Sequence, residues 1–180
     1  MADSNITKNA LAAAFKELLE NMPFEKITVG HICSQCDMNR KSFYYHFKDK
    51  YDLVNWIYYT EFIGSVKDKK YENGLSFLYD ICLYFERNRR FYRKVLKYDG
   101  QNSFFEYFRE ILSPTIQKYT EEIFANDENS KFYTDFFTDA ILNAIKNWLQ
   151  DPKNMSADKF ISLLRSCIYG TAKKVINEYQ

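Results

Sequence analysis

The scarcity of glycine and proline constrains the fold of this chain more than any other feature of its sequence. Only 5 glycines and 3 prolines occur among its 180 residues. Because these two residues build most tight turns, turns are few and the segments between them must be long. No alternating polar and apolar run bounded by turn residues is present, which argues against a sheet. The sequence therefore predicts an all-α fold of about nine helices.

Capping residues and hydrophobic periodicity locate four helices in the first part of the chain. Thr28, Asn39 and Asp49 each precede an apolar pattern, and their side-chain oxygens can accept a hydrogen bond from the first helical turn. The expected helices cover residues 7–21, 28–35, 40–47 and a long segment that begins after residue 49 and ends in the charged stretch 67–72. The first three together have the size of a small three-helix domain.

Five further helices are expected in the rest of the chain. They cover residues 75–86, 91–98, 103–124, 131–149 and 156–178. The third of these contains Pro114, so it is expected to be either kinked or divided into two pieces. Ser156 is a suitable cap for the last one.

The balance of charge excludes a general attraction to nucleic acid but leaves room for a local one. Lys and Arg number 25 against 24 Asp and Glu, a net charge of +1. Any binding to nucleic acid must therefore come from a patch. Residues 38–50 form such a patch, with a local charge of +3 from Arg40, Lys41, Lys48 and Lys50 against Asp49.

Two short helices joined by three residues are typical of a helix-turn-helix, whose second helix enters the major groove of double-stranded DNA. On the face opposite Phe43 and Phe47, the second helix presents polar side chains of long reach: Asn39, Arg40, Lys41, Tyr44, Tyr45 and His46. Arg, Asn and Lys can read base edges, whereas Tyr and His suit phosphate oxygens. The alternative interpretation is an ordinary amphipathic surface helix.

The motifs at these positions resemble the DNA-binding signature of the TetR family of bacterial one-component transcriptional regulators. The matching residues are Thr28, Val29 and Ile32, then Ser42 to Phe47, Lys50 and Leu53. The resemblance implies that the residues that contact phosphates are Thr28, Tyr44, His46 and Lys50. It implies that Asn39, Arg40 and Lys41 face bases. Tyr45 is also predicted to contact a phosphate, because its hydroxyl suits a phosphate oxygen. The family usually has Ala-Gly in the turn, where this chain has Cys36-Asp37. Asp also adopts the left-handed conformation that such a turn needs.

The resemblance further implies a homodimer with a DNA-binding domain over residues 1–50 and a helical effector-binding and dimerisation domain over residues 51–180. The aromatic stretch 78–98 is similar to a branch that includes activators of dihydroxyacetone kinase operons. That similarity adds an alternative, in which the C-terminal domain senses a protein co-regulator instead of a small molecule.

Aromatic residues, 18% of the chain, supply candidates for an effector pocket. The candidates are Tyr58, Phe62, Tyr84, Phe85, Phe104, Phe108 and Tyr119. A plain apolar core is the alternative for each of them.

The last two helices have apolar faces wider than one core requires, which favours a dimer interface. The broad faces include Phe132, Phe136, Ala140 and Leu163. The interface is predicted to use Phe137, Ile141, Ala144, Trp148, Leu164, Cys167, Ile168 and Thr171. The alternative is burial of both sides within one chain.

Two clusters have competing interpretations. Cys33 and Cys36 form a C-x-x-C pair without a second pair, so packing as small apolar residues is favoured over thiol sensing. The basic run contains Arg87, Arg89, Arg90, Arg93, Lys94 and Lys97. It is either a solvated face with ion pairs or an addition to the field that attracts DNA.

Several functions find no support in the sequence. Two histidines, no nucleophile motif, no phosphate loop and no metal-ligand spacing leave nothing on which to build an enzyme. No cofactor or metal is expected. The chain starts without the features of a signal peptide and has no run long enough to span a membrane, so we expect a cytoplasmic protein with reduced cysteines.

Overall fold

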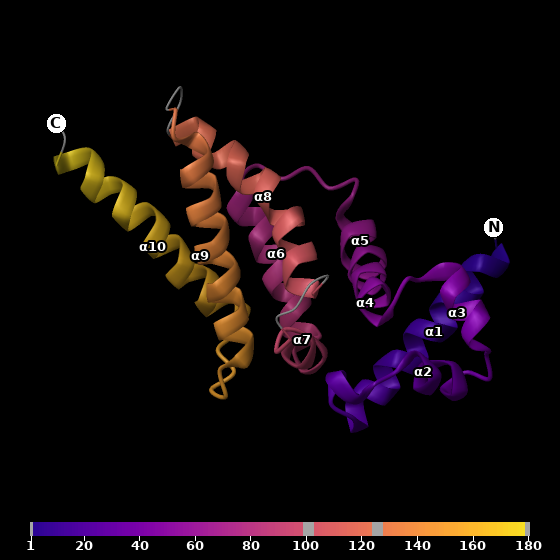
Figure 1. The fold of residues 1–180 in the computed structure, drawn as a ribbon. Coiled ribbons are helices and arrows are strands. Elements are labelled where there is room, and N and C mark those ends of the chain that lie inside the picture. The colour runs from indigo at the N-terminus through magenta and orange to yellow at the C-terminus, as the bar shows by residue number, and fades with distance from the viewer. Residues whose placement is uncertain (1, 99–102, 124–127, 179–180) are drawn as a thin grey trace. The chain divides into compact units, whose positions relative to one another are not determined.

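The computed structural model describes residues 2–98, 103–123 and 128–178, with side chains for 4–98, 103–121 and 128–170. Along the chain the elements are α1 (Ala2–Asn21), a 3-10 turn (Phe24–Lys26), α2 (Val29–Gln35), α3 (Arg40–His46), α4 (Lys50–Tyr58), a π segment (Tyr59–Ile63), α5 (Gly64–Val66), α6 (Gly74–Arg87), α7 (Arg89–Val95), α8 (Phe104–Ile123), α9 (Ser130–Gln150) and α10 (Ala157–Glu178) (Figure 1). With α4, the π segment and α5 taken as one helix, this part of the chain has nine helices and no strands. The predicted all-α class is confirmed.

Packing divides the chain into two compact units, each made from two separate stretches of sequence. Unit 1 comprises Met1–Asp68 and Arg90–Ile111, and unit 2 comprises Lys69–Arg89 and Leu112–Gln180. Helix α8 begins in unit 1 and ends in unit 2. The functional division predicted at residues 50 and 51 differs from this division by packing, and it stays a prediction.

Two expected helices differ in detail from the observed ones. Helix α1 begins at Ala2, whereas the sequence predicted a start at residue 7. The prediction started too late because the first turn is polar and lacks the apolar spacing by which a helix is recognised. Helix α8 is one continuous helix with Pro114 inside it, which excludes division into two pieces and leaves the kink, the other expected alternative. The helix continues past the main-chain hydrogen bond that proline cannot make.

The core of unit 1 is aromatic. The ring of Phe15 meets Phe24 and Phe91 edge to face, with centroids 6.1 and 6.0 Å apart. Helices α1, α2, α3 and α4 pack together, and the side chains of Ile32 and Phe43 are completely buried between them. Burial of this apolar surface provides the main free energy for folding, and it fixes α3 on α1 and α2.

The π segment widens the helix that follows α4 by one residue in a turn. Phe62 points inward from it and is buried, and the Ser65 hydroxyl donates a hydrogen bond of 2.6 Å to the Phe62 carbonyl. Glu61 on the same segment pairs with Lys16 of α1. The segment is thus held on both sides within unit 1.

Unit 2 is built on α6, which lies beside α9 and α10 (Figure 1). At one end of this bundle, the ring of Trp148 stacks on Phe160 with centroids 4.7 Å apart. The Arg89 guanidinium lies 4.5 Å from the Trp148 ring and donates hydrogen bonds to the carbonyls of Trp148 (3.0 Å) and Met155 (2.8 Å). These contacts fix the turn between α9 and α10 against the end of α6.

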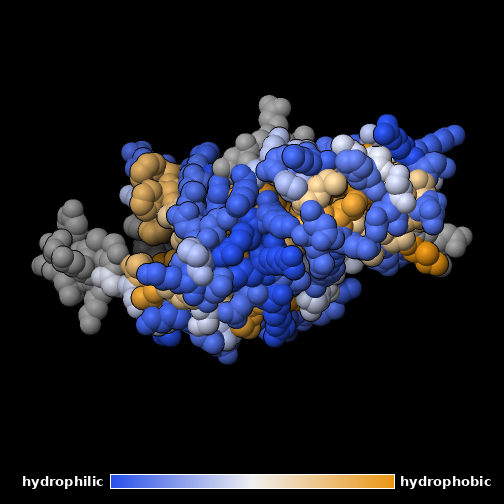
Figure 2. Space-filling model, turned by 90° about the horizontal axis from the view of Figure 1, so that it is seen from below, coloured by the Kyte–Doolittle hydropathy of each residue, from blue (hydrophilic) through white to orange (hydrophobic). Residues whose placement is uncertain are grey.

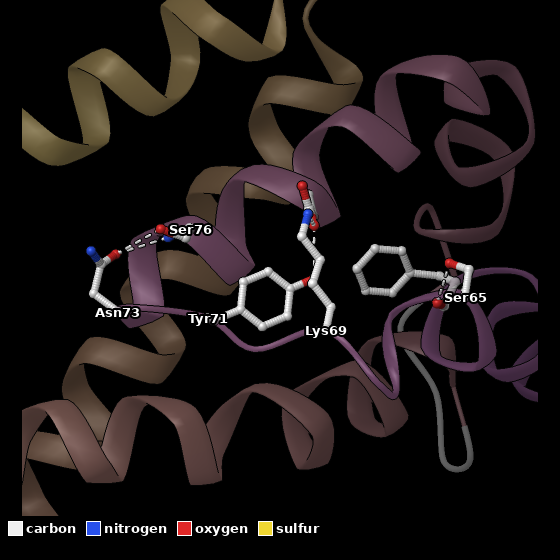
Figure 3. A network of polar contacts seen from close by, with 7 residues as sticks. Ser65, Lys69, Tyr71, Asn73 and Ser76 are labelled. Atoms are coloured by element: carbon white, nitrogen blue, oxygen red, sulfur yellow. Dashed lines mark hydrogen bonds and ion pairs between the residues drawn. The ribbon is translucent and has the colours of Figure 1, made fainter.

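The segment that precedes α6 is held by a small polar network (Figure 3). The Asp80 carboxylate accepts hydrogen bonds from the Lys69 ammonium and the Tyr71 hydroxyl, the latter at 2.7 Å. Asn73 caps α6, because its side-chain oxygen accepts a hydrogen bond of 3.0 Å from the Ser76 N–H. Burial alone would raise the pKa of Asp80, but the hydrogen bonds from Lys69 and Tyr71 outweigh it and lower that pKa.

The described surface is mostly hydrophilic on the face shown in Figure 2, where hydrophobic residues form separate patches. Large exposed apolar side chains include Phe132 and Phe136 on α9, whose rings stack with centroids 6.3 Å apart. Within the described ranges, no helix has both the length and the apolar character that a membrane span requires.

The lowered pKa of Asp80 predicts a stability that depends on pH. The folded state favours the ionised carboxylate, so its contribution is complete above the ordinary Asp pKa and is lost as the pH falls through the lowered value. We expect Asp80→Asn to reduce the free energy of unfolding by about 1–2 kcal/mol at pH 7. In urea unfolding, the difference from the wild type should shrink below about pH 4. Asp68→Asn, at an exposed carboxyl nearby in sequence, is the control and should change little; a difference for Asp80→Asn that is constant from pH 7 to 3 would contradict the network.

Candidate nucleic-acid interface

The first helix of the helix-turn-helix starts with a reciprocal cap. The Thr28 hydroxyl oxygen accepts a hydrogen bond of 3.2 Å from the His31 N–H, and the Thr28 N–H donates to Nδ1 of His31 at 3.3 Å. Because its oxygen is the acceptor, the hydroxyl hydrogen of exposed Thr28 remains available for a phosphate. The role of His31 was missed in the sequence, although the T-x-x-H spacing is that of a capping box.

The turn between α2 and α3 depends on a left-handed residue. Asp37 has a φ of 52°, as expected for its position in the turn. This conformation lets the Met38 N–H donate a hydrogen bond of 2.9 Å to the Cys33 carbonyl, which closes the end of α2. The predicted turn at Cys36-Asp37 is confirmed.

Helix α3 buries one face and exposes the other. Phe43 is completely buried, whereas Tyr44 and Tyr45 are 58% and 84% exposed. At helical spacing, Arg40 and Lys41 lie on the same side as these two tyrosines, and both are exposed. Four side chains suited to phosphate or base edges therefore share the outer face.

Two of the predicted DNA-contact residues also contact neighbouring residues of the chain. Asn39 caps α3, because its side-chain oxygen accepts hydrogen bonds from the Ser42 N–H (2.8 Å) and hydroxyl (3.1 Å). His46 is half-buried, with its ring 4.9 Å from that of Tyr45. An open hollow of about 370 Å³ lies beside α3, lined by Thr7, Met38, Asn39, Lys41, Ser42, Tyr45 and His46. For Asn39, the amide N–H₂ group is the part left to meet a base.

Lys50 holds three main-chain carbonyls together. Its ammonium donates hydrogen bonds to the carbonyls of Phe24 (2.7 Å), Ile27 (2.8 Å) and Glu25 (3.2 Å). It also lies 4.5 Å from the centre of the Phe24 ring. Burial lowers the pKa of Lys50 from its ordinary value, against the opposing effects of Glu25 and Asp49. An ammonium has three hydrogens, so the predicted phosphate contact requires at least one of these bonds to break.

The basic run in and around α7 is not a continuous solvated face. The Lys94 ammonium donates hydrogen bonds to the carbonyls of Leu19 and Glu20 at the end of α1, the second at 3.0 Å. Arg89 is engaged in unit 2, as described above. Arg87, Arg90 and Lys97 are exposed. Two of the six charges therefore hold helix ends within their own units.

The C-x-x-C pair packs inside unit 1. The Cys33 thiol is buried and donates to the Asn39 carbonyl at 3.6 Å, and the Cys36 thiol donates to the Ile32 carbonyl at 3.3 Å. Burial, with a further contribution from the neighbouring Cys36 and Asp37 respectively, raises the pKa of both thiols. Within the described residues, no disulfide joins any of the four cysteines. The favoured interpretation as small apolar residues agrees with this placement.

The candidates for an effector pocket lie in two places. In unit 1, Tyr58 packs directly on Phe62, Phe104 and Phe108, with ring centroids 5.2–5.8 Å apart. In unit 2, Tyr119 helps to line a cavity of about 20 Å³ between α6, α8, α9 and α10. Phe85 is completely buried and Tyr84 is half-buried. The unit 1 candidates thus contact one another.

The residues predicted for the dimer interface differ in exposure. Trp148 and Ile141 are buried, and Cys167 is exposed. The half-buried members are Phe137, Ala144, Leu164 and Ile168. The side chain of Thr171 lies outside the described residues. On α9 the exposed apolar residues are Phe132, Phe136 and Ala140, each one position before a half-buried or buried residue of the predicted interface or its extension along the helix.

Family models match both parts of the chain. Residues 10–57 match "Bacterial regulatory proteins, tetR family", and residues 72–170 match "Transcriptional regulator C-terminal region" of the same family. The chain belongs to the TetR family. It is therefore a transcriptional regulator, as the earlier resemblance implied, and not an enzyme.

Individual TetR-family relatives agree with this assignment. The HTH-type dhaKLM operon transcriptional activator DhaS of Lactococcus lactis subsp. lactis (strain IL1403) is 29% identical over 109 residues, which are 60% of this chain and 57% of that protein. The chain thus aligns with little more than half of this relative's length.

Solved TetR-family structures share the fold. A TetR regulator from Streptococcus agalactiae 2603V has a TM-score of 0.70 at 23% identity, over 90% of this chain and 93% of its own. A dihydroxyacetone kinase operon activator DhaS has a TM-score of 0.63 at 20% identity, over 93% and 97%. NalD, the secondary repressor of the MexAB-OprM multidrug efflux pump in Pseudomonas aeruginosa, has a TM-score of 0.60 at 20% identity, over 93% of this chain and 96% of its own.

The bonds of Lys50 predict that it stabilises the protein without DNA. Lys50→Met keeps an unbranched apolar stem but removes the ammonium donor of three carbonyls, of which, within the described part of the chain, only that of Phe24 keeps a hydrogen bond, from the Ile27 N–H. We expect it to lower the free energy of unfolding by about 2–3 kcal/mol, measured by urea unfolding. Lys41→Met, at an exposed position of α3, is the matched control and should cost no more than about 0.5 kcal/mol. Equal stabilities of the two variants would show that the three bonds contribute nothing.

Proposed function

We propose that the chain acts as a homodimer that reads a palindromic operator with two copies of α3, under control of an effector at residues 51–180. The observation that carries the proposal is the outer face of α3, where Arg40, Lys41, Tyr44 and Tyr45 are all exposed opposite buried Phe43. A two-fold dimer would present these faces to successive major grooves, roughly 34–36 Å apart.

The contacts divide by chemistry. Arg40 and Lys41 read base edges near the start of α3, assisted by the amide N–H₂ group of Asn39. Tyr44, Tyr45, His46 and Thr28 meet phosphates and set the register of the helix in the groove. Residues 1–50 are thus the DNA-binding domain, and Lys50 orients it from within.

Substitution of Tyr44 tests this arrangement. We expect Tyr44→Ala to weaken binding to every sequence about tenfold, because a phosphate contact carries no base preference. The measurement is a gel shift at stated salt, with an operator selected by the wild type from random DNA. Tyr59→Ala is the matched control, since Tyr59 is 56% exposed but lies outside the helix-turn-helix. Wild-type affinity in Tyr44→Ala would remove Tyr44 from the interface.

Homodimer formation is proposed through α9 and α10. Phe132 and Phe136 are 65% and 58% exposed on α9, and Leu163 is 43% exposed on α10. Large apolar side chains gathered at the surface are typical of protein interfaces. The half-buried residues Phe137 and Leu164 flank them and extend the same faces.

A charge at the centre of this face is expected to separate the protomers. Phe136→Glu should raise the dissociation constant of the dimer at least about a hundredfold, since it would bury an unpaired carboxylate. Sedimentation equilibrium measures this directly. Tyr59→Glu introduces the same charge at an equally exposed aromatic residue and should leave the mass unchanged. A dimer as tight as the wild type in Phe136→Glu would place the interface elsewhere.

A second proposal concerns the effector, which is either a small molecule or a protein co-regulator. The mutual packing of Tyr58, Phe104 and Phe108 and the cavity of about 20 Å³ favour the protein, because a cavity of this size has room for about one water molecule. An open polar groove of about 570 Å³ offers a surface for it, lined by Lys69, Lys70, Tyr71, Glu72, Asn73, Leu75, Ser76, Tyr79, Asp80, Ile161, Arg165 and Tyr169. A structure in which Tyr58 and Phe104 part around a bound metabolite would instead favour the small molecule.

A further inference from the structure

We propose that Gly30, in the helix before the recognition helix, is a specificity-determining residue that seats the guanidinium of Arg40. The inference rests on the proposed function, in which Arg40 reads a base edge. It adds a residue that acts on the operator only through Arg40. Nothing about this position follows from the motifs of the helix-turn-helix.

The guanidinium of Arg40 lies very close to the main chain at Gly30. A Cβ atom built on Gly30 would lie 2.6 Å from Nη2 of Arg40 and 3.3 Å from both Cζ and Nε. The three nearest atoms all belong to one guanidinium, and a distance under 3.0 Å is a clash that the side chain must relieve by moving. The plane of Arg40 therefore occupies the space that any other residue at position 30 would fill.

The backbone gives no other reason for glycine here. Gly30 lies in the first turn of α2, and none of the described glycines has a positive φ. A helical position disfavours glycine because of the freedom that it loses on folding. Close approach of another group is the remaining physical use of glycine at such a site, and Arg40 makes that approach. By contrast, a Cβ on Gly64 would lie 3.5 Å from the Tyr59 carbonyl oxygen, which is an ordinary contact.

The seat matters because arginine recognises guanine with a planar fork. Both N–H groups must be aligned with the base edge at once. Arg40 is the first residue of α3, and the early residues of a recognition helix are those that contact bases. A flexible side chain that is already ordered loses less freedom on binding. Gly30 thus leaves open the space in which the guanidinium lies, and a side chain at position 30 would displace it.

The test is a double-mutant cycle with Gly30→Ala and Arg40→Ala, measured on the operator selected by the wild type and on its single-base variants. We expect Gly30→Ala to bind the operator about tenfold more weakly and to discriminate less at the base pair that Arg40→Ala also affects. In the Arg40→Ala background, Gly30→Ala should have no further effect. The thermal unfolding midpoint of the single variant Gly30→Ala should be unchanged or raised by about 2–4 °C, because alanine favours the helix. Gly64→Ala is the matched control and should bind like the wild type.

Two results would overturn the seat. One is wild-type binding and discrimination in Gly30→Ala; the other is a loss that persists in full when Arg40 is already alanine. A readout without DNA covers failure of the proposed function, which would appear as a wild type that selects no sequence. In that case the Nε–H resonance of Arg40 decides: a shifted, more mobile signal in Gly30→Ala supports the seat, and an unchanged signal overturns it.

Discussion

The ammonium group of Lys50 makes the contacts on which the arrangement of the helix-turn-helix depends. It joins the first turn of α4 to the carbonyls of Phe24, Glu25 and Ile27, and so fixes the connection between α1 and α2. Lys94 closes the end of α1 from α7 in the same way. Two stretches of main chain therefore receive hydrogen bonds from lysines of other helices. Because the bonds to Phe24, Ile27 and Leu19 are partly buried, and a carbonyl left without a partner there is costly, the path of this connection, and with it the start of α2, depends on α4 and α7.

On this frame the helix-turn-helix divides its residues between two tasks. Thr28, Asn39 and Asp37 shape the main chain through caps and a left-handed turn. Arg40, Lys41, Tyr44 and Tyr45 remain exposed. A residue that caps a helix has fewer hydrogen-bonding groups left for the proposed contact with DNA, as Asn39 has with its amide oxygen engaged. The proposed contacts are accordingly concentrated in exposed side chains that form neither a cap nor the turn.

The sequence predicts those features that depend on near neighbours. The caps at Thr28, Asn39 and Asp49 were identified because each bond spans two or three residues. The partners of Lys50 lie 23 to 26 residues away, so spacing in the sequence could not reveal them. The same limit applies to the apolar face of α9: periodicity located it, but only packing shows that Phe136 is outside and Trp148 inside. Its part in a dimer stays a prediction.

The π segment at Tyr59–Ile63 makes the number of residues in this helix as important as their identity. Its wide turn holds one residue more than an α-turn. Within the segment, Glu61 pairs with Lys16 and Phe62 enters the aromatic core. Deletion of one residue here would return the segment to regular α-helical geometry without turning the later side chains, whereas one further inserted residue in a regular helix would rotate them by about 100°. The direction of a length change thus decides whether the side chains beyond the segment keep their faces.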